Sequence, residues 1–285
     1  MELFSAIIWN VQPEIFTVGG FSPRWYGVLF SSGFFLGYIL MSRMFIREHR
    51  PVTDMEPLTL SMIAGTIIGM RLGHCLFYQP DYYLANPLEI LQIWKGGYAS
   101  HGAVIGISAA LWLYSRNRPK QPFLWIIDRI AIVAALAAVM IRTGNFFNHE
   151  MIGKTTDAAW GVVFTLRDLL PRHPSQLYEA ALYLMTFLLM RFIYNRYDAR
   201  TPNGLLLGVF FICIFGARFL VEFSKENQVA FENSLPLNMG QILSIPLVAL
   251  GLFLVWRAMA NPVITLPNKT LIQEKAQGQK REKAK

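Results

Sequence analysis

Charged and polar residues gather at the end of one long apolar run. Arg142, Asn145, Asn148, His149 and Glu150 fall within nine residues, directly after a stretch rich in alanine, valine and isoleucine. Inside or beside lipid such groups are expensive, and they are usually paired or functional. A guanidinium presents a rigid fork of donors that suits phosphate or carboxylate oxygens. This segment therefore indicates a candidate anion site.

Four further apolar runs carry polar residues near one end. These residues are Tyr26 in the first run, Arg71 and His74 in the second, His101 in the third, and Arg218 with Glu222 in the sixth. If these ends share one side of a membrane, five helices bring polar groups to a single depth. Two arginines at headgroup depth then favour a lipid phosphate as the ligand.

Each of these residues also has a purely structural explanation. An arginine at a helix end often extends its charge to the membrane surface. Arg218 and Glu222 are four apart and could neutralise each other. His101 could be an ordinary interfacial polar residue, and Arg71 and His74 could be hydrogen-bond partners between helices. The shared depth is the observation that favours a site.

Membrane spans are the elements that must position these groups. The chain has 285 residues, is 54% hydrophobic with a mean hydropathy of +0.36, and repeats long apolar runs. Runs of about 18 residues cross a hydrocarbon core of ~30 Å. We predict an all-α polytopic membrane bundle with about seven transmembrane helices. The predicted spans are residues 25–45, 57–77, 98–114, 123–141, 174–193, 204–223 and 240–259.

Small residues within these spans predict how they pack. Gly65, Gly69 and Gly73 are four apart in the second span, and Gly102 and Gly106 are four apart in the third. Such spacing lets helix backbones approach closely in lipid.

Positive charge predicts the orientation. Three basic residues lie near or just after the end of each of the first, third and fifth spans, and at least seven of the 26 Lys and Arg lie from Arg257 onward. By the positive-inside rule these segments are cytoplasmic, and the amino terminus is periplasmic. We predict one transmembrane domain over residues 1–260, with a periplasmic loop of about 142–173, and a basic cytoplasmic tail, 261–285. The net charge of +8 then reflects the basic cytoplasmic segments, so nucleic acid is not an expected partner.

The predicted loop and the amino terminus have few regular elements. Residues 1–23 should form an irregular or surface-lying lead-in, and residues 160–164 resemble a short strand. Pro174 suits the first turn of the fifth span. Glu179 follows in the second turn, where its simplest role is to complement the positive end of the helix dipole.

Cys75 and Cys213 lie in apolar runs without metal-ligand spacing, so no metal or cofactor is expected.

The sequence resembles the prolipoprotein diacylglyceryl transferase family of bacterial inner-membrane enzymes. The matching segments are colinear and cover nearly the whole chain. They are RWYG at 24–27, GMRLGHCLFY at 69–78, GGYASHG at 96–102, RTGNFFNHEMIG at 142–153, RHPSQLYE at 172–179, ARFLVEF at 217–223 and MGQILSIP at 239–246. The segment at 142–153 together with RHPSQLYE and MGQILSIP is highly specific.

The resemblance implies a reaction between phosphatidylglycerol and the lipobox cysteine of a prolipoprotein signal peptide, within membrane lipid. The cysteine thiol displaces a phosphate ester from a glycerol carbon, giving a thioether and glycerol phosphate. Arg142 and Arg218 would hold the phosphate, His101 would accept or relay the thiol proton, and Glu222 would orient Arg218. The other residues that would shape the phosphatidylglycerol site are Tyr26, Asn145, Asn148, Glu150 and Gly153.

Two positions depart from the family pattern. Ile141 stands where a glycine usually precedes the arginine, and Ile214 with Phe215 stand where many members have Tyr-Gly.

The alternative class of protein is a transporter or channel whose pathway the same polar groups would line. Transporters often show internal repeats and sites near the midplane, whereas here no repeat is found and the polar groups gather at one side. A structural assembly protein, the third class, would not need paired arginines at phosphate depth.

Overall fold

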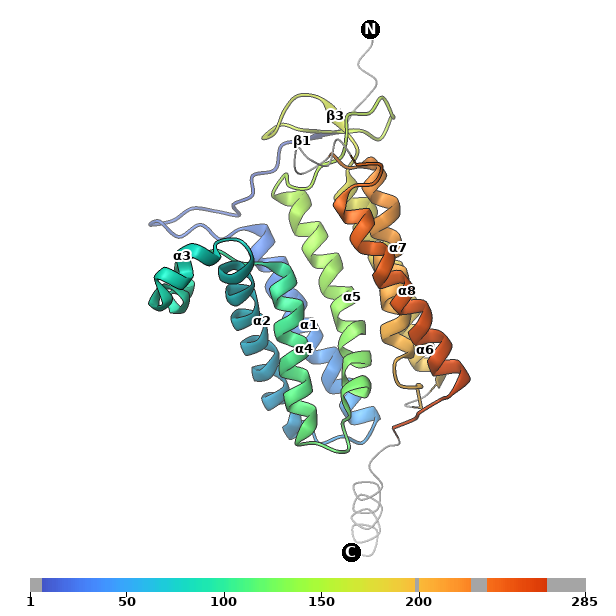
Figure 1. The fold of residues 1–285 in the computed structure, drawn as a ribbon. Coiled ribbons are helices and arrows are strands. Elements are labelled where there is room, and N and C mark those ends of the chain that lie inside the picture. Colours follow the sequence, from blue (N-terminus) through green and yellow to red (C-terminus); the bar gives the residue numbers. More distant parts are fainter. Residues whose placement is uncertain (1–6, 198–199, 227–234, 266–285) are drawn as a thin grey trace, which may run out of the picture. The chain divides into compact units, whose positions relative to one another are not determined.

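A computed structural model describes residues 7–197, 200–226 and 235–265, and its described elements are mostly helical (Figure 1). The helices are α1 Trp25–Arg47, α2 Met55–Phe77, α3 Pro80–Ala85, α4 Ser100–Arg116, α5 Phe123–Phe147, α6 Ser175–Tyr197, α7 Leu205–Val221 and α8 Met239–Ala260. The strands are β1 Ile7–Trp9, β2 Val162–Phe164 and β3 Pro171–Arg172. The predicted basic tail falls almost entirely outside the described residues.

Six helical segments of the described chain are long and apolar enough to cross a membrane, and they contain α1, α2, α5, α6, α7 and α8. This confirms the predicted polytopic helical membrane fold. The remaining predicted span is α4, which has 17 residues. At 1.5 Å per residue it measures about 26 Å, slightly less than a ~30 Å hydrocarbon core. That a seventh helix crosses the membrane therefore stays a prediction.

The chain forms two compact units. Of the described residues, the larger unit holds those within 7–41 and 128–264, and the smaller unit holds residues 42–127. Arg142 and Arg218 belong to the larger unit, whereas Arg71 and His101 belong to the smaller one. The predicted common depth of all five helix ends therefore stays a prediction.

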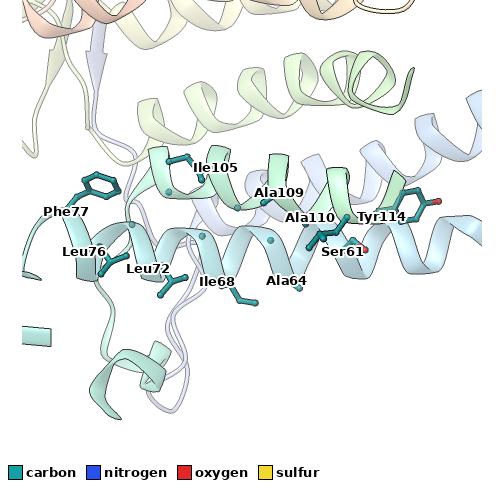
Figure 2. Close-up of a pocket in the computed structure, with 16 residues that line it drawn as sticks. Ser61, Ala64, Ile68, Leu72, Leu76, Phe77, Ile105, Ala109, Ala110 and Tyr114 are labelled. Atoms are coloured by element: carbon teal, nitrogen blue, oxygen red, sulfur yellow. The ribbon is translucent and has the colours of Figure 1, made fainter. Parts of the chain in front are cut away.

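In the smaller unit, glycines let α2 and α4 pack backbone to backbone. A Cβ added at Gly65 would lie 2.7 Å from the carbonyl oxygen of Gly106, and one at Gly69 would collide with the carbonyl of Gly102. The close helix packing predicted from these glycines is confirmed. Figure 2 shows an apolar pocket of about 580 Å³ along the same seam, with Ile68 and Leu72 of α2 among its lining residues.

Arg71 has a structural role in this unit. Its Nε donates to the carbonyl of Ile90 at 2.9 Å, Nη1 to Gly96 at 2.6 Å and Nη2 to Glu89 at 2.6 Å. The side chain is buried at the end of α2 and holds the connection to α4. The structural alternative considered for Arg71 therefore fits, with carbonyls of the connecting loop as partners in place of another helix.

In the larger unit, a small sheet covers the end of α5. β1 pairs with β2 in parallel, and β2 pairs with β3 antiparallel. Phe146, Ile152, Val162 and Phe164 form a buried cluster against which Trp9 packs. The short strand predicted within residues 160–164 is confirmed. The irregular lead-in is wrong for β1, because a three-residue strand is too short to show an alternating pattern in sequence.

Helix α5 is six residues longer than predicted, ending at Phe147 instead of residue 141. The burial of Phe146 extends its apolar face past Arg142. Just after the helix, His149 has a φ of 55°, the left-handed conformation that commonly terminates a helix. The amide of His149 donates to Phe146 and that of Glu150 to Asn145, a pattern that satisfies the last carbonyls of a helix. Arg142 and Asn145 are thus helical residues, and the predicted loop of about 142–173 begins later.

Candidate functional site

Asp128 sets the relative height of α5 and α7 within the larger unit. Its carboxylate is fully buried and accepts from the amides of Gly204 at 2.7 Å and Leu207 at 2.8 Å. These amides belong to the first turn of α7, where helix amides lack partners of their own. Arg142 lies fourteen residues after Asp128, and Arg218 lies fourteen after Gly204. Both rise about 21 Å along their helices, so α5 and α7 deliver two guanidinium groups to the same level.

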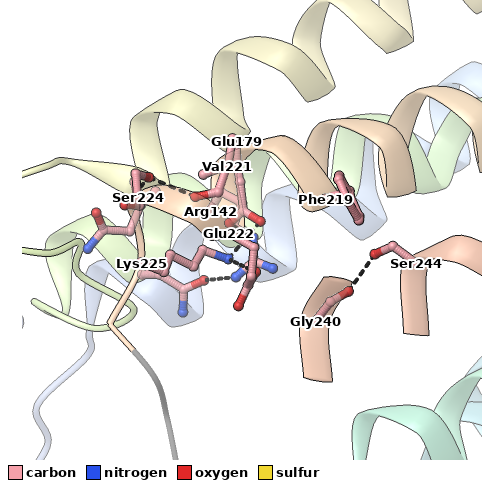
Figure 3. A network of polar contacts seen from close by, with 12 residues as sticks. Arg142, Glu179, Phe219, Val221, Glu222, Ser224, Lys225, Gly240 and Ser244 are labelled. Carbon is pink, nitrogen blue, oxygen red and sulfur yellow. Dashed lines mark hydrogen bonds and ion pairs between the residues drawn. The ribbon is translucent and has the colours of Figure 1, made fainter. Parts of the chain in front are cut away.

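Arg142 is held by a carboxylate from α6. Its Nε lies 2.8 Å from Oε2 of Glu179, a side chain with no exposed surface, while Arg142 itself is 16% exposed (Figure 3). Nη1 also donates to Oδ1 of Asn145 at a longer 3.3 Å. Glu179 thus occupies the inner edge of the guanidinium. Among the described residues the guanidinium otherwise meets only neutral groups, Asn145 and the Tyr183 hydroxyl, so its outer nitrogens, Nη1 and Nη2, can serve an anion.

Glu179 is the centre of a larger buried network. Its Oε1 lies 2.9 Å from Nζ of Lys225, and the same ammonium lies 3.1 Å from Oε2 of Glu222. Tyr183 donates to Oε1 of Glu179 at 3.3 Å. We call the alternating series Arg142, Glu179, Lys225 and Glu222 the four-charge chain. Removing one member of a buried pair is strongly destabilising because it leaves an uncompensated charge, so these four residues depend on one another.

Arg218 differs from Arg142 in having no fixed partner. Within the described residues it makes neither a hydrogen bond nor an ion pair, although it is only partly exposed. Its charge and that of Arg142 both act on the Tyr183 hydroxyl. A half-buried guanidinium without an anion beside a satisfied one is suited to receive a ligand anion.

Glu222 does not orient Arg218, so that prediction is wrong. Helix α7 ends at Val221, and Glu222 begins a tighter 3₁₀ turn. In a 3₁₀ turn residues three apart lie on the same side, which brings Lys225 beside the Glu222 carboxylate. Glu222 instead contacts Lys225 and packs against α8, where a Cβ added at Gly240 would lie 2.6 Å from its Cδ.

The end of α5 and the following loop continue the polar network. Glu150 accepts from Nδ2 of Asn145 at 3.2 Å and from Nδ2 of Asn148 at 3.2 Å. Asn145 therefore links Arg142 to Glu150. Gln176, fully buried at the start of α6, donates to the backbone carbonyl of Glu150. The structure thus brings these predicted site residues together.

Gly153 leaves no room for a side chain. Its amide donates to the carbonyl of His173 at 2.9 Å, and a Cβ would lie 2.6 Å from that oxygen. Gly153 also forms an isolated β-bridge with Lys225, next to the Lys154 amide that donates to Ser224 at 2.8 Å. The loop backbone therefore passes between the start of α6 and the turn after α7 and fixes the backbone of Lys225.

Arg172 braces the same loop from β3. Its Nη1 donates to the Gly153 carbonyl at 3.2 Å, and its Nη2 donates to Asp168 at 2.6 Å. These hydrogen bonds from Arg172 hold the pKa of Asp168 below its ordinary value and raise the pKa of Arg172 itself. Both groups stay charged at neutral pH. Arg172 is therefore fully engaged in the loop, and it adds no free cation to the site.

Tyr26 joins the site from α1. Its side chain packs across Gly144 of α5, where an added Cβ would lie 2.8 Å from Cδ2 of Tyr26. The charges of Glu150 and Arg142 both act on its hydroxyl. The structure thus places Tyr26 beside the residues with which it was predicted to act.

His101 lies in the smaller unit, at the start of α4. Its imidazole is exposed, and its ring centroid lies 5.4 Å from that of Phe77 and 5.7 Å from that of Tyr78. The role of His101 in proton transfer stays a prediction.

Two residues of the network were missed from the sequence. Glu179 was assigned only to the helix dipole, and Lys225 was not singled out. The available signal was the position of Glu179, a lone carboxylate in the second turn of an apolar span, since such a residue usually has a partner. Nothing local in sequence identifies that partner, because Arg142 and Lys225 are 37 and 46 residues away.

This chain is similar to a group of named enzymes. A family model described as prolipoprotein diacylglyceryl transferase matches residues 13–257. A phosphatidylglycerol–prolipoprotein diacylglyceryl transferase of Chloroherpeton thalassium is 48% identical over 259 residues, which cover 91% of this chain and 97% of the relative. Proteins of the same name from Tolumonas auensis and Bacteroides fragilis are 45% and 43% identical, over 87% and 90% of this chain and 96% of each relative.

Proposed function

Because this chain belongs to the prolipoprotein diacylglyceryl transferase family, we propose that it transfers the diacylglyceryl group of phosphatidylglycerol to the lipobox cysteine of a prolipoprotein. This reaction is the first step of bacterial lipoprotein maturation. The structural observation that carries the proposal is the pair of arginines at one level, Arg142 held by Glu179 and Arg218 without a partner among the described residues. Such a pair suits one phosphate approached from two helices.

The reaction assigns distinct tasks to these groups. The cysteine sulfur attacks the glycerol carbon that bears the phosphate, a C–S bond forms and the C–O bond breaks. The electron pair of that bond goes to the phosphate oxygen, and glycerol phosphate leaves with additional charge. Arg142 and Arg218 stabilise this developing charge in a water-poor site, where fixed donors act most strongly. The thiol must lose its proton, since the thiolate is the nucleophile.

The remaining polar residues line the headgroup. We assign Glu150, which two carboxamides hold in place, to the hydroxyls of the phosphatidylglycerol headgroup, because an ionised carboxylate accepts from such donors. Tyr26 and Asn145 line the headgroup site on either side of Glu150. Gly153 and Glu222 act through backbone and charge placement, as their contacts with Lys225 suggest.

The transfer itself is the first experiment. Purified protein in phosphatidylglycerol-containing detergent micelles should add the mass of a diacylglyceryl group to a lipobox peptide. A peptide with serine in place of the cysteine should stay unmodified, because its hydroxyl is far less ionised than a thiol at neutral pH. Folded protein that leaves the cysteine peptide unmodified in several lipid compositions would contradict the proposed function.

We further propose a bacterial inner-membrane location with a periplasmic amino terminus and a cytoplasmic carboxyl terminus. The basic residues near the ends of α1, α4 and α6 and in the connections that follow them support this orientation. Reporter fusions after Arg118 and at the carboxyl end are expected to read cytoplasmic, and a fusion near Asp157 should read periplasmic. A cytoplasmic signal near Asp157 would overturn the orientation and the periplasmic placement of the site.

We assign the thiol proton to His101, since imidazole titrates nearest to neutral pH. His101→Gln is expected to lower turnover mainly below pH 8. Activity should partly recover above that, as a thiol with a pKa of ~8.5 ionises unaided. The measurement is the pH–rate profile of both proteins. Identical profiles would show that another group accepts the proton.

A further inference from the structure

We propose that Lys225 is a positioning residue for the transfer reaction: its ammonium fixes Glu179, and through Glu179 it sets the orientation of the Arg142 guanidinium. The inference rests on the proposed function, because the effect of this orientation is expressed in the transfer rate. It adds a residue that never touches the substrate to the two arginines that do.

The geometry of the four-charge chain supports this role (Figure 3). Lys225 Nζ contacts Glu179 at 2.9 Å and Glu222 at 3.1 Å, while the other oxygen of Glu179 contacts Arg142 at 2.8 Å. The side chains of Lys225, Glu179 and Glu222 are 3%, 0% and 5% exposed. With so little access to water, Glu179 cannot exchange Lys225 for solvent, so each oxygen has one fixed cation.

The backbone, and not a flexible side chain alone, places this ammonium. The β-bridge from Gly153 to Lys225 ties the residue to the loop after α5. Beside it, Ser224 Oγ lies 3.1 Å from Ser175 Oγ at the start of α6. Lys225 is therefore anchored to the three elements whose residues it connects, α5 through the loop, α6 and α7.

Charge explains why a cation is needed there. Glu179 and Glu222 are buried beside the place where an anionic phospholipid must bind. Lys225 and Arg142 balance these two carboxylates, which leaves the charge of Arg218 for the single negative charge of a phosphodiester. Without Lys225, an uncompensated carboxylate would repel the lipid phosphate or take up a proton, because burial disfavours an unpaired charge.

The test compares Lys225→Met with Lys154→Met. Both changes remove one ammonium, and the two residues lie on neighbouring segments of backbone. Lys154 is exposed, however, and among the described residues its Nζ contacts only the Phe223 carbonyl, at 3.1 Å. Lys225→Met is expected to lower kcat about 30-fold with a change in KM for phosphatidylglycerol below about 3-fold, since orientation of Arg142 acts on the transition state. Lys154→Met should stay within about 2-fold of wild type, and Lys225→Arg should recover most of the activity.

Folding is checked by thermal unfolding of each variant, and Lys225→Gln, which keeps a donor without the charge, is the second variant. Equal losses in the Lys225 and Lys154 variants, or a normal kcat in folded Lys225→Met, would overturn the positioning role. Wild-type protein that fails to modify the peptide would instead refute the proposed function. In that case a double-mutant cycle of Lys225→Met and Arg142→Lys, measured on the affinity for phosphatidylglycerol, tests the positioning role. Coupled changes in binding free energy support that role, and additive changes refute it.

Discussion

Arg142→Lys and Arg218→Lys are each expected to lower the rate of diacylglyceryl transfer by at least ~100-fold, which is about 2.7 kcal/mol of transition-state stabilisation. The exchange keeps the charge and removes the planar fork. At position 142 a lysine cannot contact Glu179 and also offer two parallel donors to a phosphate, as the guanidinium can. At position 218 the whole fork is unpaired among the described residues, so all of its donors are available to the substrate.

The loss should appear in kcat more than in lipid binding, because charge builds up on the phosphate as the C–O bond breaks. Steady-state kinetics with phosphatidylglycerol and a lipobox peptide gives both quantities. Arg196→Lys is the control, since Arg196 lies exposed in the last turn of α6 in the same unit. Near-normal rates in folded Arg142→Lys and Arg218→Lys would refute the two-arginine clamp and leave the cluster as a packing device.

Gly153→Ala is expected to reduce activity at least ~10-fold and to destabilise the fold by about 1–3 kcal/mol, the usual range for overpacking. The new methyl group would lie 2.6 Å from the backbone oxygen of His173, which the β-bridged loop cannot easily move. Any shift of this loop also moves Lys225, its partner in the bridge. Turnover and thermal unfolding are measured on the same preparation.

Gly216→Ala is the matched control for this substitution. Gly216 lies in α7, and a Cβ added there meets nothing within 4 Å. Alanine favours a helix over glycine by up to about 1 kcal/mol, so this variant should be as stable as wild type or slightly more so. If Gly153→Ala behaved like Gly216→Ala, the loop would have to be less constrained than its contacts indicate.

Several features of the fold follow from local properties of the sequence. Long apolar runs predicted the helices, because the length and polarity of one segment decide whether it suits a bilayer. Glycines four apart predicted the seam between α2 and α4, since removing the Cβ is what permits close approach. Chemical type and predicted depth indicated Arg142 and Arg218 as candidate phosphate ligands, and the colinear motifs led to the family. Each of these inferences needs only residues that are neighbours in sequence.

The partners of the charged residues were decided by the tertiary structure. Arg71 binds the carbonyls of a later loop, and Glu222 binds Lys225, which a 3₁₀ turn places beside it. Glu179 collects two cations from segments far away in sequence. An unpaired charge can satisfy itself with any opposite charge that the fold brings within about 4 Å. Which charge that is depends on helix register, here set by the bond from Asp128 to the start of α7, and register is a property of the packed chain.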